Sequence, residues 1–190
     1  DVAALGSDFL VTGRKVGISI QYIFPVAARV TGAGTVLDAS PLVLGNSYLA
    51  TAPAVVALGA RWLVAWHRNA THDNSYCTSM GAFIEAGGLA TPEFQIHGPF
   101  STAGGNGIFE VGLASTGNTA LFVQSQELTS GVENDLLCRV IDATGAVGPQ
   151  INLTPWSGNQ YRPRVAWDGA NFIVTYQDQK NRLALSTLDQ

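Results

Sequence analysis

Charge is scarce in this sequence. Only 13% of its 190 residues are Asp, Glu, Lys or Arg, where about a quarter is usual for a soluble domain. Lysine occurs only at Lys15 and Lys180, no run of Lys and Arg is present, and the net charge is −4. Nucleic acids and acidic membrane surfaces are bound through basic patches, so the composition argues against both as partners.

Long hydrophobic runs and a cysteine framework are missing too. No apolar stretch approaches the roughly 20 residues that span a bilayer, so no direct membrane insertion is expected. The two cysteines, Cys77 and Cys138, are too few for a disulfide scaffold and lack the spacing of a metal site. Two separately buried thiols are favoured over a bridge, and no cofactor is predicted. The glycosylation sequons at Asn69 and Asn152 are short patterns that often arise by chance.

Helical periodicity and catalytic motifs are also absent. No window keeps the 3.6-residue period of an amphipathic helix for more than two turns, so little helix is expected. No nucleophile elbow, zinc-protease motif or phosphate loop is present, and no enzyme is predicted. Glycosidases use a pair of carboxylates, so this chemistry stays open. The candidate residues are Glu85, Glu93, Glu110, Glu127 and Glu133.

What the sequence does have is a repeat. Two apolar strands around a glycine turn recur along the chain, with the turn glycines at Gly6, Gly59, Gly117 and Gly169, at intervals of 53, 58 and 52 residues. A second set, Gly34, Gly88 and Gly145, follows the first three at 28, 29 and 28 residues. Because two independent landmarks keep one spacing, the sequence predicts repeats of about 50–58 residues.

Each repeat is interpreted as four short strands. In the third repeat they are expected at 111–115, 120–124, 136–142 and 150–153, with glycine turns after the first and third strands. Strands such as Trp62–Trp66 are apolar on both faces, as in a sheet that is covered on both sides. The pattern indicates an all-β fold, a β-propeller-like array of four-stranded antiparallel blades. A tandem of β-sandwiches or a prism of hairpins is the alternative.

The repeats are expected in a single propeller-type domain. Their approximate bounds are 1–51, 52–107, 108–160 and 161–190. The last repeat stops before its second glycine turn, so the chain holds about three and three-quarter blades. We expect the chain to be part of a larger propeller, since six to eight blades are common. The other option is that another segment supplies the missing strand.

The best-preserved copy of the repeat carries a family likeness. Residues Pro163 to Asp178 match the pattern P-x-V-A-W-D-G-x-N-F-[IL]-V-x-[WY]-Q-D, and a weaker D-A-T-G-A-V stands at Asp142–Val147. The pattern resembles the degenerate propeller repeats of large secreted proteins of bacteria, and the likeness extends over the whole chain as repeats. It implies a secreted or cell-surface location, extracellular or periplasmic, and a binding or scaffolding role. It implies no conserved chemistry.

Unequal loops point to one face of such a fold. The connections between second and third strands, and between successive repeats, open on the same face and vary in length. They are expected at 67–75, 97–107, 125–135 and 155–160. Binding residues tend to lie on variable loops held by a rigid scaffold, so a partner is expected on this face.

The side chains on these loops support two kinds of site. His67, His72 and Asp73, joined by His97 if folding brings it near, are of the types that bind Zn²⁺. Their spacing fixes no geometry, so a solvated hairpin is favoured and no metal site is predicted. Trp156 can stack on a sugar ring together with a second aromatic residue, or pack over the blade edge.

The start of the fourth repeat adds further candidates. Tyr161 is that second aromatic residue, and Arg162 and Arg164 flank Pro163. These arginines either bind an anion or pair with a carboxylate of the neighbouring blade. The candidate ligand-binding residues are thus His67, His72, Asp73, His97, Trp156, Tyr161 and Arg162.

The sequence favours a non-catalytic extracellular module that presents a loop-rich face to a protein or glycan partner, or to neighbouring subunits of an assembly. One alternative is a carbohydrate-binding lectin or carbohydrate-active enzyme domain, with Trp156, Tyr161 and a carboxylate around one pocket. The other is a structural subunit of an extracellular assembly, which would show a large apolar patch on the side of a blade.

Overall fold

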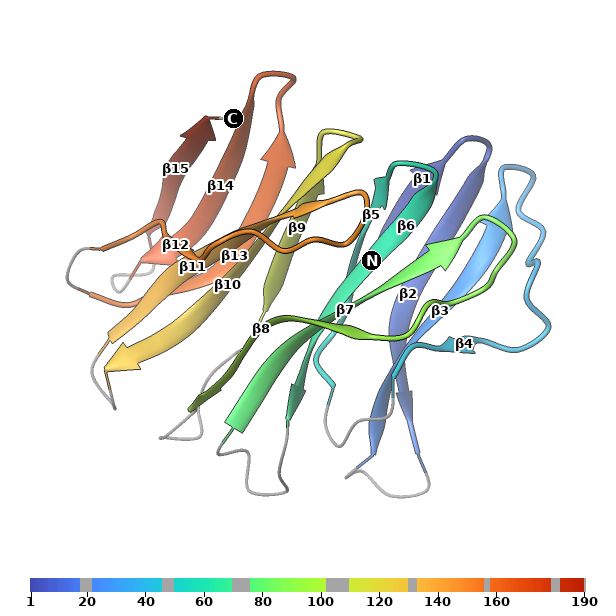
Figure 1. Ribbon diagram of the computed structural model, residues 1–190, viewed down its shortest axis with the longest axis horizontal. Coiled ribbons are helices and arrows are strands. Elements are labelled where there is room, and N and C mark those ends of the chain that lie inside the picture. The colour runs from blue at the N-terminus through green and yellow to red at the C-terminus, as the bar shows by residue number, and fades with distance from the viewer. Residues whose placement is uncertain are drawn as a thin grey trace. The chain divides into compact units, whose positions relative to one another are not determined.

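The computed structural model describes residues 1–17, 22–45, 50–69, 76–101, 110–129, 133–155, 158–178 and 182–189. Fifteen strands lie in these ranges. They form four antiparallel sheets in which consecutive strands are neighbours (Figure 1). The predicted all-β fold of four-stranded antiparallel units is confirmed. Among the described residues, no helix is long and apolar enough to cross a membrane.

The first two sheets make up a compact unit, Asp1–Phe100. The first sheet contains β1 (Val2–Leu5), β2 (Asp8–Val16), β3 (Ile23–Thr31) and β4 (Leu42–Val43). The second sheet contains β5 (Ala54–Leu58), β6 (Arg61–Asn69), β7 (Tyr76–Glu85) and β8 (Phe94–Ser101).

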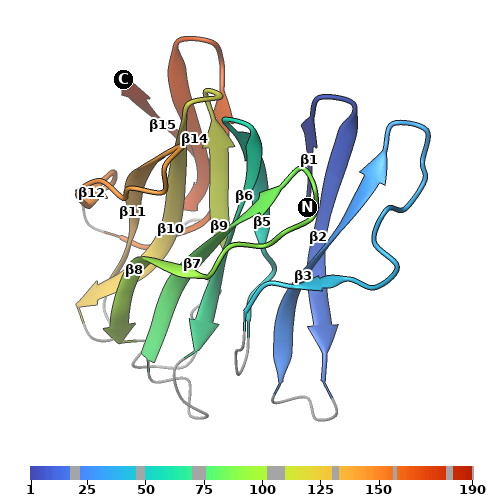
Figure 2. The same cartoon turned by 45° about the vertical axis from the view of Figure 1, so that its right-hand side comes forward.

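The other two sheets make up the second unit, Ser101–Gln190. The third sheet contains β9 (Val111–Ser115), β10 (Thr119–Thr129), β11 (Glu133–Asp142) and β12 (Ile151–Asn152). The fourth contains β13 (Gln160–Trp167), β14 (Asn171–Asp178) and β15 (Leu183–Asp189), three strands within the described residues. Figure 2 shows the same strands from a second direction.

The landmark glycines occupy the turns that their spacing predicted. All seven have positive φ, between 62° and 103°, which side chains other than glycine rarely adopt. The turn between third and fourth strands also repeats its hydrogen bonds. Gly34 N donates to Thr31 O at 2.8 Å in the first sheet, and Gly145 N donates to Asp142 O at 3.0 Å in the third. The spacing in the sequence therefore corresponds to a recurring piece of backbone.

Three of the predicted loops are shorter than expected. The strand β6 continues to Asn69, β10 continues to Thr129, and β8 extends over residues 94–101, so His97 lies in a strand and not in a loop. The reason is that backbone pairing persists where the apolar pattern has ended: Gln126 still pairs with Asp135. Polar residues can extend a strand at little cost in stability, because their backbone N–H and C=O groups stay hydrogen-bonded to the neighbouring strand.

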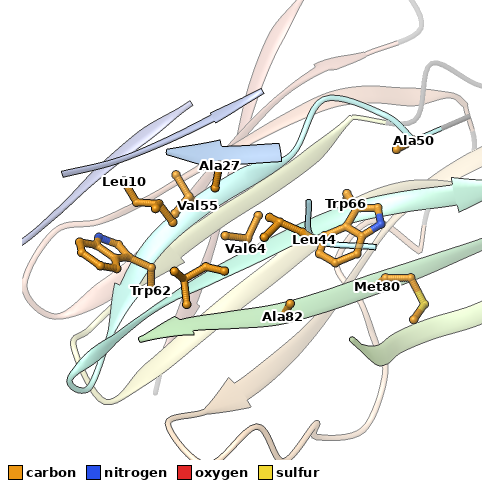
Figure 3. Packing of buried hydrophobic residues seen from close by; sticks show 11 residues of the cluster. Leu10, Ala27, Leu44, Ala50, Val55, Trp62, Val64, Trp66, Met80 and Ala82 are labelled. Carbon is orange, nitrogen blue, oxygen red and sulfur yellow. The ribbon is translucent and has the colours of Figure 1, made fainter. Parts of the chain in front are cut away.

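The core of the first unit lies between its two sheets. Trp62, Val64 and Trp66 of β6 belong to one buried cluster with Leu10 and Ala27 of the first sheet (Figure 3). Both tryptophans are at most 1% exposed, and each large apolar side chain that is fully buried stabilises the fold by about 1.5–3 kcal/mol.

The second unit repeats this arrangement. Phe172, Val174 and Tyr176 alternate along β14 and pack against the third sheet, as the two-residue period of a strand requires. Cys138 belongs to this cluster. Both Cys138 and Cys77 are unpaired, as favoured from the sequence. Burial raises the pKa of each thiol to about 12.

The outward face of the first sheet carries exposed apolar side chains. Val2, Phe9, Val11 and Val43 are between 39% and 56% exposed, and register places Val2 opposite Val11. An uncovered apolar sheet face is the feature that the structural-subunit alternative requires, and that alternative stays a prediction.

Candidate functional site

Polar side chains gather in the second unit at the end of the sheets where the first strands begin. They come from the starts of β9, β11 and β13 and from the end of β14. We call this set the loop face of the second unit: Glu110, Asn134, Asn159, Tyr161, Arg162, Arg164 and Gln177. All but Arg162 and Arg164 are half-buried, and those two arginines are exposed.

A β-bulge at the start of β13 places the arginines. Tyr161 pairs with Gln177 and Arg164 with Thr175, so Arg162 and Pro163 together oppose a single residue of β14. Arg162 has a φ of 53° and is the one non-glycine residue with positive φ in the described part of the chain. A bulge whose first residue is left-handed normally carries glycine there, and a residue before proline is normally extended.

The bulge directs the two arginines to different partners. Arg164 Nη1 lies 2.6 Å from Glu110 Oε2 on the neighbouring sheet, which is the ion pair with an adjacent blade that the sequence suggested for these arginines. The side chains of Arg164 and Glu110 are 64% and 32% exposed. Exposed ion pairs contribute only about 0–1 kcal/mol to the stability of the fold, so the main effect of this pair is to orient the two side chains. Arg162 Nη1 donates to Gln177 Oε1 at 3.3 Å.

The strands β9 and β13 approach closely at this site. A Cβ atom on Gly112 would lie 2.8 Å from Val165 Cγ2 and 3.3 Å from Pro163 O. Glycine at this position therefore permits the separation at which Glu110 reaches Arg164.

Amide and phenol groups form the second part of the loop face. Asn159 Oδ1 accepts hydrogen bonds from Asn134 N at 2.8 Å and from Asn134 Nδ2 at 3.2 Å. The same Nδ2 lies 3.4 Å from the Tyr161 hydroxyl oxygen. These contacts tie the start of β11 to the connection that leads into β13, and they hold the tyrosine beside two amides.

A buried polar network holds this connection from below. Gln160, only 3% exposed, accepts a hydrogen bond from Thr154 Oγ1 at 3.1 Å and donates one to Gly158 O at 2.9 Å. Ser125 Oγ donates to Gln160 O at 2.6 Å, and Thr154 Oγ1 accepts from Leu136 N at 2.8 Å. Satisfied buried networks of this kind make the groups above them rigid.

Two of the histidines that were predicted as ligands, His67 and His97, lie in the first unit. His67 is fully buried on β6; its Nδ1 lies 3.1 Å from Ser79 Oγ, and its ring meets Phe100 edge-on at 6.0 Å. Burial, with a smaller contribution from the charge of His97, lowers the pKa of His67 to about 3. The ring of His97 also lies near Phe100, with 5.5 Å between the ring centroids.

The remaining predicted residues divide into two groups. Tyr161 and Arg162 are adjacent on the loop face of the second unit, whereas His72, Asp73 and Trp156 lie outside the described residues. In the ranges that the structure describes, no three His, Cys, Asp or Glu side chains gather as a metal site would require.

Sequence reasoning missed most of the loop face. Asn134, Asn159 and Gln177 were not singled out, and Glu110 was one of five glutamates. The available signal was position: Asn134 and Asn159 belong to the connections predicted at 125–135 and 155–160. Their convergence depends on the register between sheets, which local patterns do not encode.

Comparison with known proteins identifies the fold. No family model and no curated protein matches the sequence. Among solved structures, the chain is similar to sucrose-6-phosphate hydrolase from Lactobacillus gasseri (TM-score 0.59, 11% identity, covering 99% of this chain and 44% of that one). It is also similar to the GH43 endo-arabinanase from Bacillus licheniformis (TM-score 0.59, 11% identity, covering 98% of this chain and 70% of that one).

A third similar structure is the Penicillium chrysogenum α-L-arabinanase complexed with arabinobiose (TM-score 0.56, 11% identity, covering 96% of this chain and 71% of that one). The chain spans less than half the length of the first of these proteins and about 70% of the other two. At this identity the likeness shows the fold alone, which is of the β-propeller type.

These structures correct the main functional interpretation. The fold was interpreted from the sequence as a non-catalytic binding or scaffolding module, whereas the similar structures are a sucrose-6-phosphate hydrolase and two arabinanases. The carbohydrate alternative is therefore taken up as a proposal in the next subsection. The physical reason for the error is that a propeller builds its site from single residues on separate strands, so no contiguous motif marks it.

Proposed function

We propose that this chain is a carbohydrate-binding β-propeller domain that binds a glycan at the loop face of the second unit. The observation that carries the proposal is the convergence of a tyrosine, three amides, a carboxylate and two guanidinium groups from three strands and from the residues that precede β9 and β13. The buried network around Gln160 holds the connection that carries Asn159 and leads to Tyr161.

The chemistry of these groups suits a sugar. Amide and carboxylate side chains offer donors and acceptors in fixed directions, which match the hydroxyl groups of a pyranose or furanose. Tyr161 adds an apolar ring with a polar tip, as binding sites for amphipathic ligands commonly do. The likeness of the fold to structures named as a sugar-phosphate hydrolase and as arabinanases supports the same substrate class by analogy.

A titration tests the proposal. The chain is titrated calorimetrically with a panel of soluble oligosaccharides that includes arabinan fragments, neutral galactans and oligouronates. Tyr161→Ala is expected to weaken binding about tenfold, equal to about 1.4 kcal/mol, within the range of an aromatic contact. The matched control is Tyr76→Ala, which removes a tyrosine that is 52% exposed in the first unit. If no glycan binds, or if both variants bind equally, the proposal is wrong.

The sequence-based expectation that the chain is not an enzyme stays a prediction. Glycosidases use two carboxyl groups about 5–10 Å apart, and Glu110 is held by Arg164. Incubation of the chain with the glycan it binds, followed by a reducing-end assay, is expected to release no sugar. Release that disappears in Glu110→Gln would instead make Glu110 a catalytic residue. The secreted or cell-surface location likewise stays a prediction.

A further inference from the structure

Arg162 carries a positive charge that no acidic group of the described chain balances. Of the other described arginines in the second unit, Arg164 pairs with Glu110 and Arg182 with Asp178, each at 2.6 Å. Arg139 donates to a backbone carbonyl, Gly148 O, at 2.8 Å. The partner of Arg162 is the neutral amide of Gln177, at 3.3 Å.

The backbone of Arg162 points to a role for its side chain. A left-handed residue at the first position of a bulge, directly before proline, is where glycine is expected. A non-glycine residue in this region is strained, and such strain concentrates at binding and catalytic sites. Arg162 holds this conformation with a φ of 53°, and its side chain is exposed on the loop face of the second unit.

The charges of the loop face leave one positive charge unmatched. It contains Glu110, Arg162 and Arg164, and the first and last of these neutralise each other. A chain with a net charge of −4 therefore presents a local cation beside the amides and Tyr161. The Gln177 contact uses Nη1, and the side chain of Arg162 is exposed.

We infer that the glycan bound at the loop face is acidic, and that Arg162 binds the carboxylate of a uronic acid residue. A guanidinium fork matches a planar carboxylate with two parallel hydrogen bonds, which a neutral sugar hydroxyl cannot supply. The inference rests on the proposed function, because it names the substrate class of that same site.

The test compares one sugar with and without its charge. Wild-type protein is titrated with an oligogalacturonate and with the methyl ester of the same oligosaccharide. The free acid is expected to bind at least about tenfold more tightly, as the loss of a charged hydrogen bond implies. This preference is expected to shrink as ionic strength rises, since the pair is exposed.

Three variants locate the preference. Arg162→Gln and Arg162→Gly are expected to bind acid and ester equally, whereas Arg14→Gln, which removes an exposed arginine from the first unit, is expected to keep the preference. Arg162→Gly also separates recognition from folding. Because glycine accepts the left-handed conformation, its unfolding temperature is expected to equal or exceed that of the wild type, and a fall would contradict the strain argument.

The outcomes distinguish this inference from the proposed function. If acid and ester bind wild-type protein equally, or if Arg162→Gln keeps the preference, the inference is wrong and glycan binding still stands. If neither probe nor any neutral glycan of the panel binds, the proposed function itself fails. A sulfated glycan of the same length serves as a further probe. If it binds as tightly as the uronate, the fork recognises any anion and the assignment to a carboxylate is overturned.

Discussion

Arg162 occupies a backbone position that suits glycine better than arginine. The left-handed conformation costs a non-glycine residue about 1–2 kcal/mol, and the exposed side chain of Arg162 contacts Gln177. Sites that bind ligands commonly keep such locally unfavourable residues. Sequence patterns predicted Arg162 as a candidate but not its conformation, because a residue before proline is expected to be extended.

The second residue-scale feature is the buried His67, which makes stability depend on pH. Its pKa is about 3 in the folded chain and about 6.5 when unfolded. Between these values the unfolded chain binds more protons than the folded chain. The free energy of unfolding therefore falls as the pH drops below about 6.5, by up to about 1.4 kcal/mol per pH unit.

Urea unfolding at several pH values between about 6.5 and 4.5 measures this dependence. His67→Gln is expected to remove most of the slope, and His97→Gln, which changes a less buried histidine, is expected to keep it. Asp38 does not affect the slope in this pH range. Its pKa is lowered from 3.8 mainly by a hydrogen bond from Arg29, so its contribution to the free energy of unfolding is lost only at lower pH. An unchanged slope in His67→Gln would show that His67 is not the group responsible.

At the scale of the element, the close approach of β9 to β13 is the feature that builds the loop face. Gly112→Val is expected to lower the free energy of unfolding by about 1–3 kcal/mol, as overpacking does, because its Cβ would meet Val165 Cγ2 and Pro163 O. The matched control is Gly13→Val, since a Cβ on this strand glycine of β2 meets nothing within 4 Å. Urea midpoints compare the two. Equal effects would mean that the separation of β9 and β13 does not depend on glycine.

The elements themselves were largely predictable. The strand expected at 111–115 is β9, with the same bounds, because apolar alternation and a glycine turn specify a hairpin locally. The second strand of that repeat was expected at 120–124 and extends from Thr119 to Thr129. Its polar end is held by cross-strand pairing with β11, a tertiary effect that a hydrophobic pattern does not contain.

At the scale of the whole molecule, the repeat predicted the fold class but could not predict the site. Asn134, Arg162 and Gln177 lie on three strands of two sheets, and Glu110 directly precedes a fourth strand, β9. Only the register at the bulge of β13 and the contact between sheets bring them together. Repetition is a property of the scaffold, so the residues that break it, such as the left-handed Arg162, carry the functional information.

The apolar outward face of the first sheet belongs to the same scale. Phe9 and Val11 are 39% and 43% exposed, so they add little to the stability of the chain as it stands. The prediction that the chain is part of a larger propeller, or of an assembly, would give this face a partner. Sedimentation over a range of concentrations tests self-association. If the chain stays monomeric, a second copy of the chain is excluded as the partner of this face.

The central claim is that a glycan binds at the loop face of the second unit, and amide chemical-shift mapping tests it most directly. Isotopically labelled chain is titrated with the oligosaccharide that binds most tightly. The largest shifts are expected at Asn134, Asn159, Tyr161, Arg162 and Gln177, with small changes at the Gly117 and Gly145 turns of the same unit. Shifts confined to those turns or to the first unit, or no shifts at saturation, would contradict it.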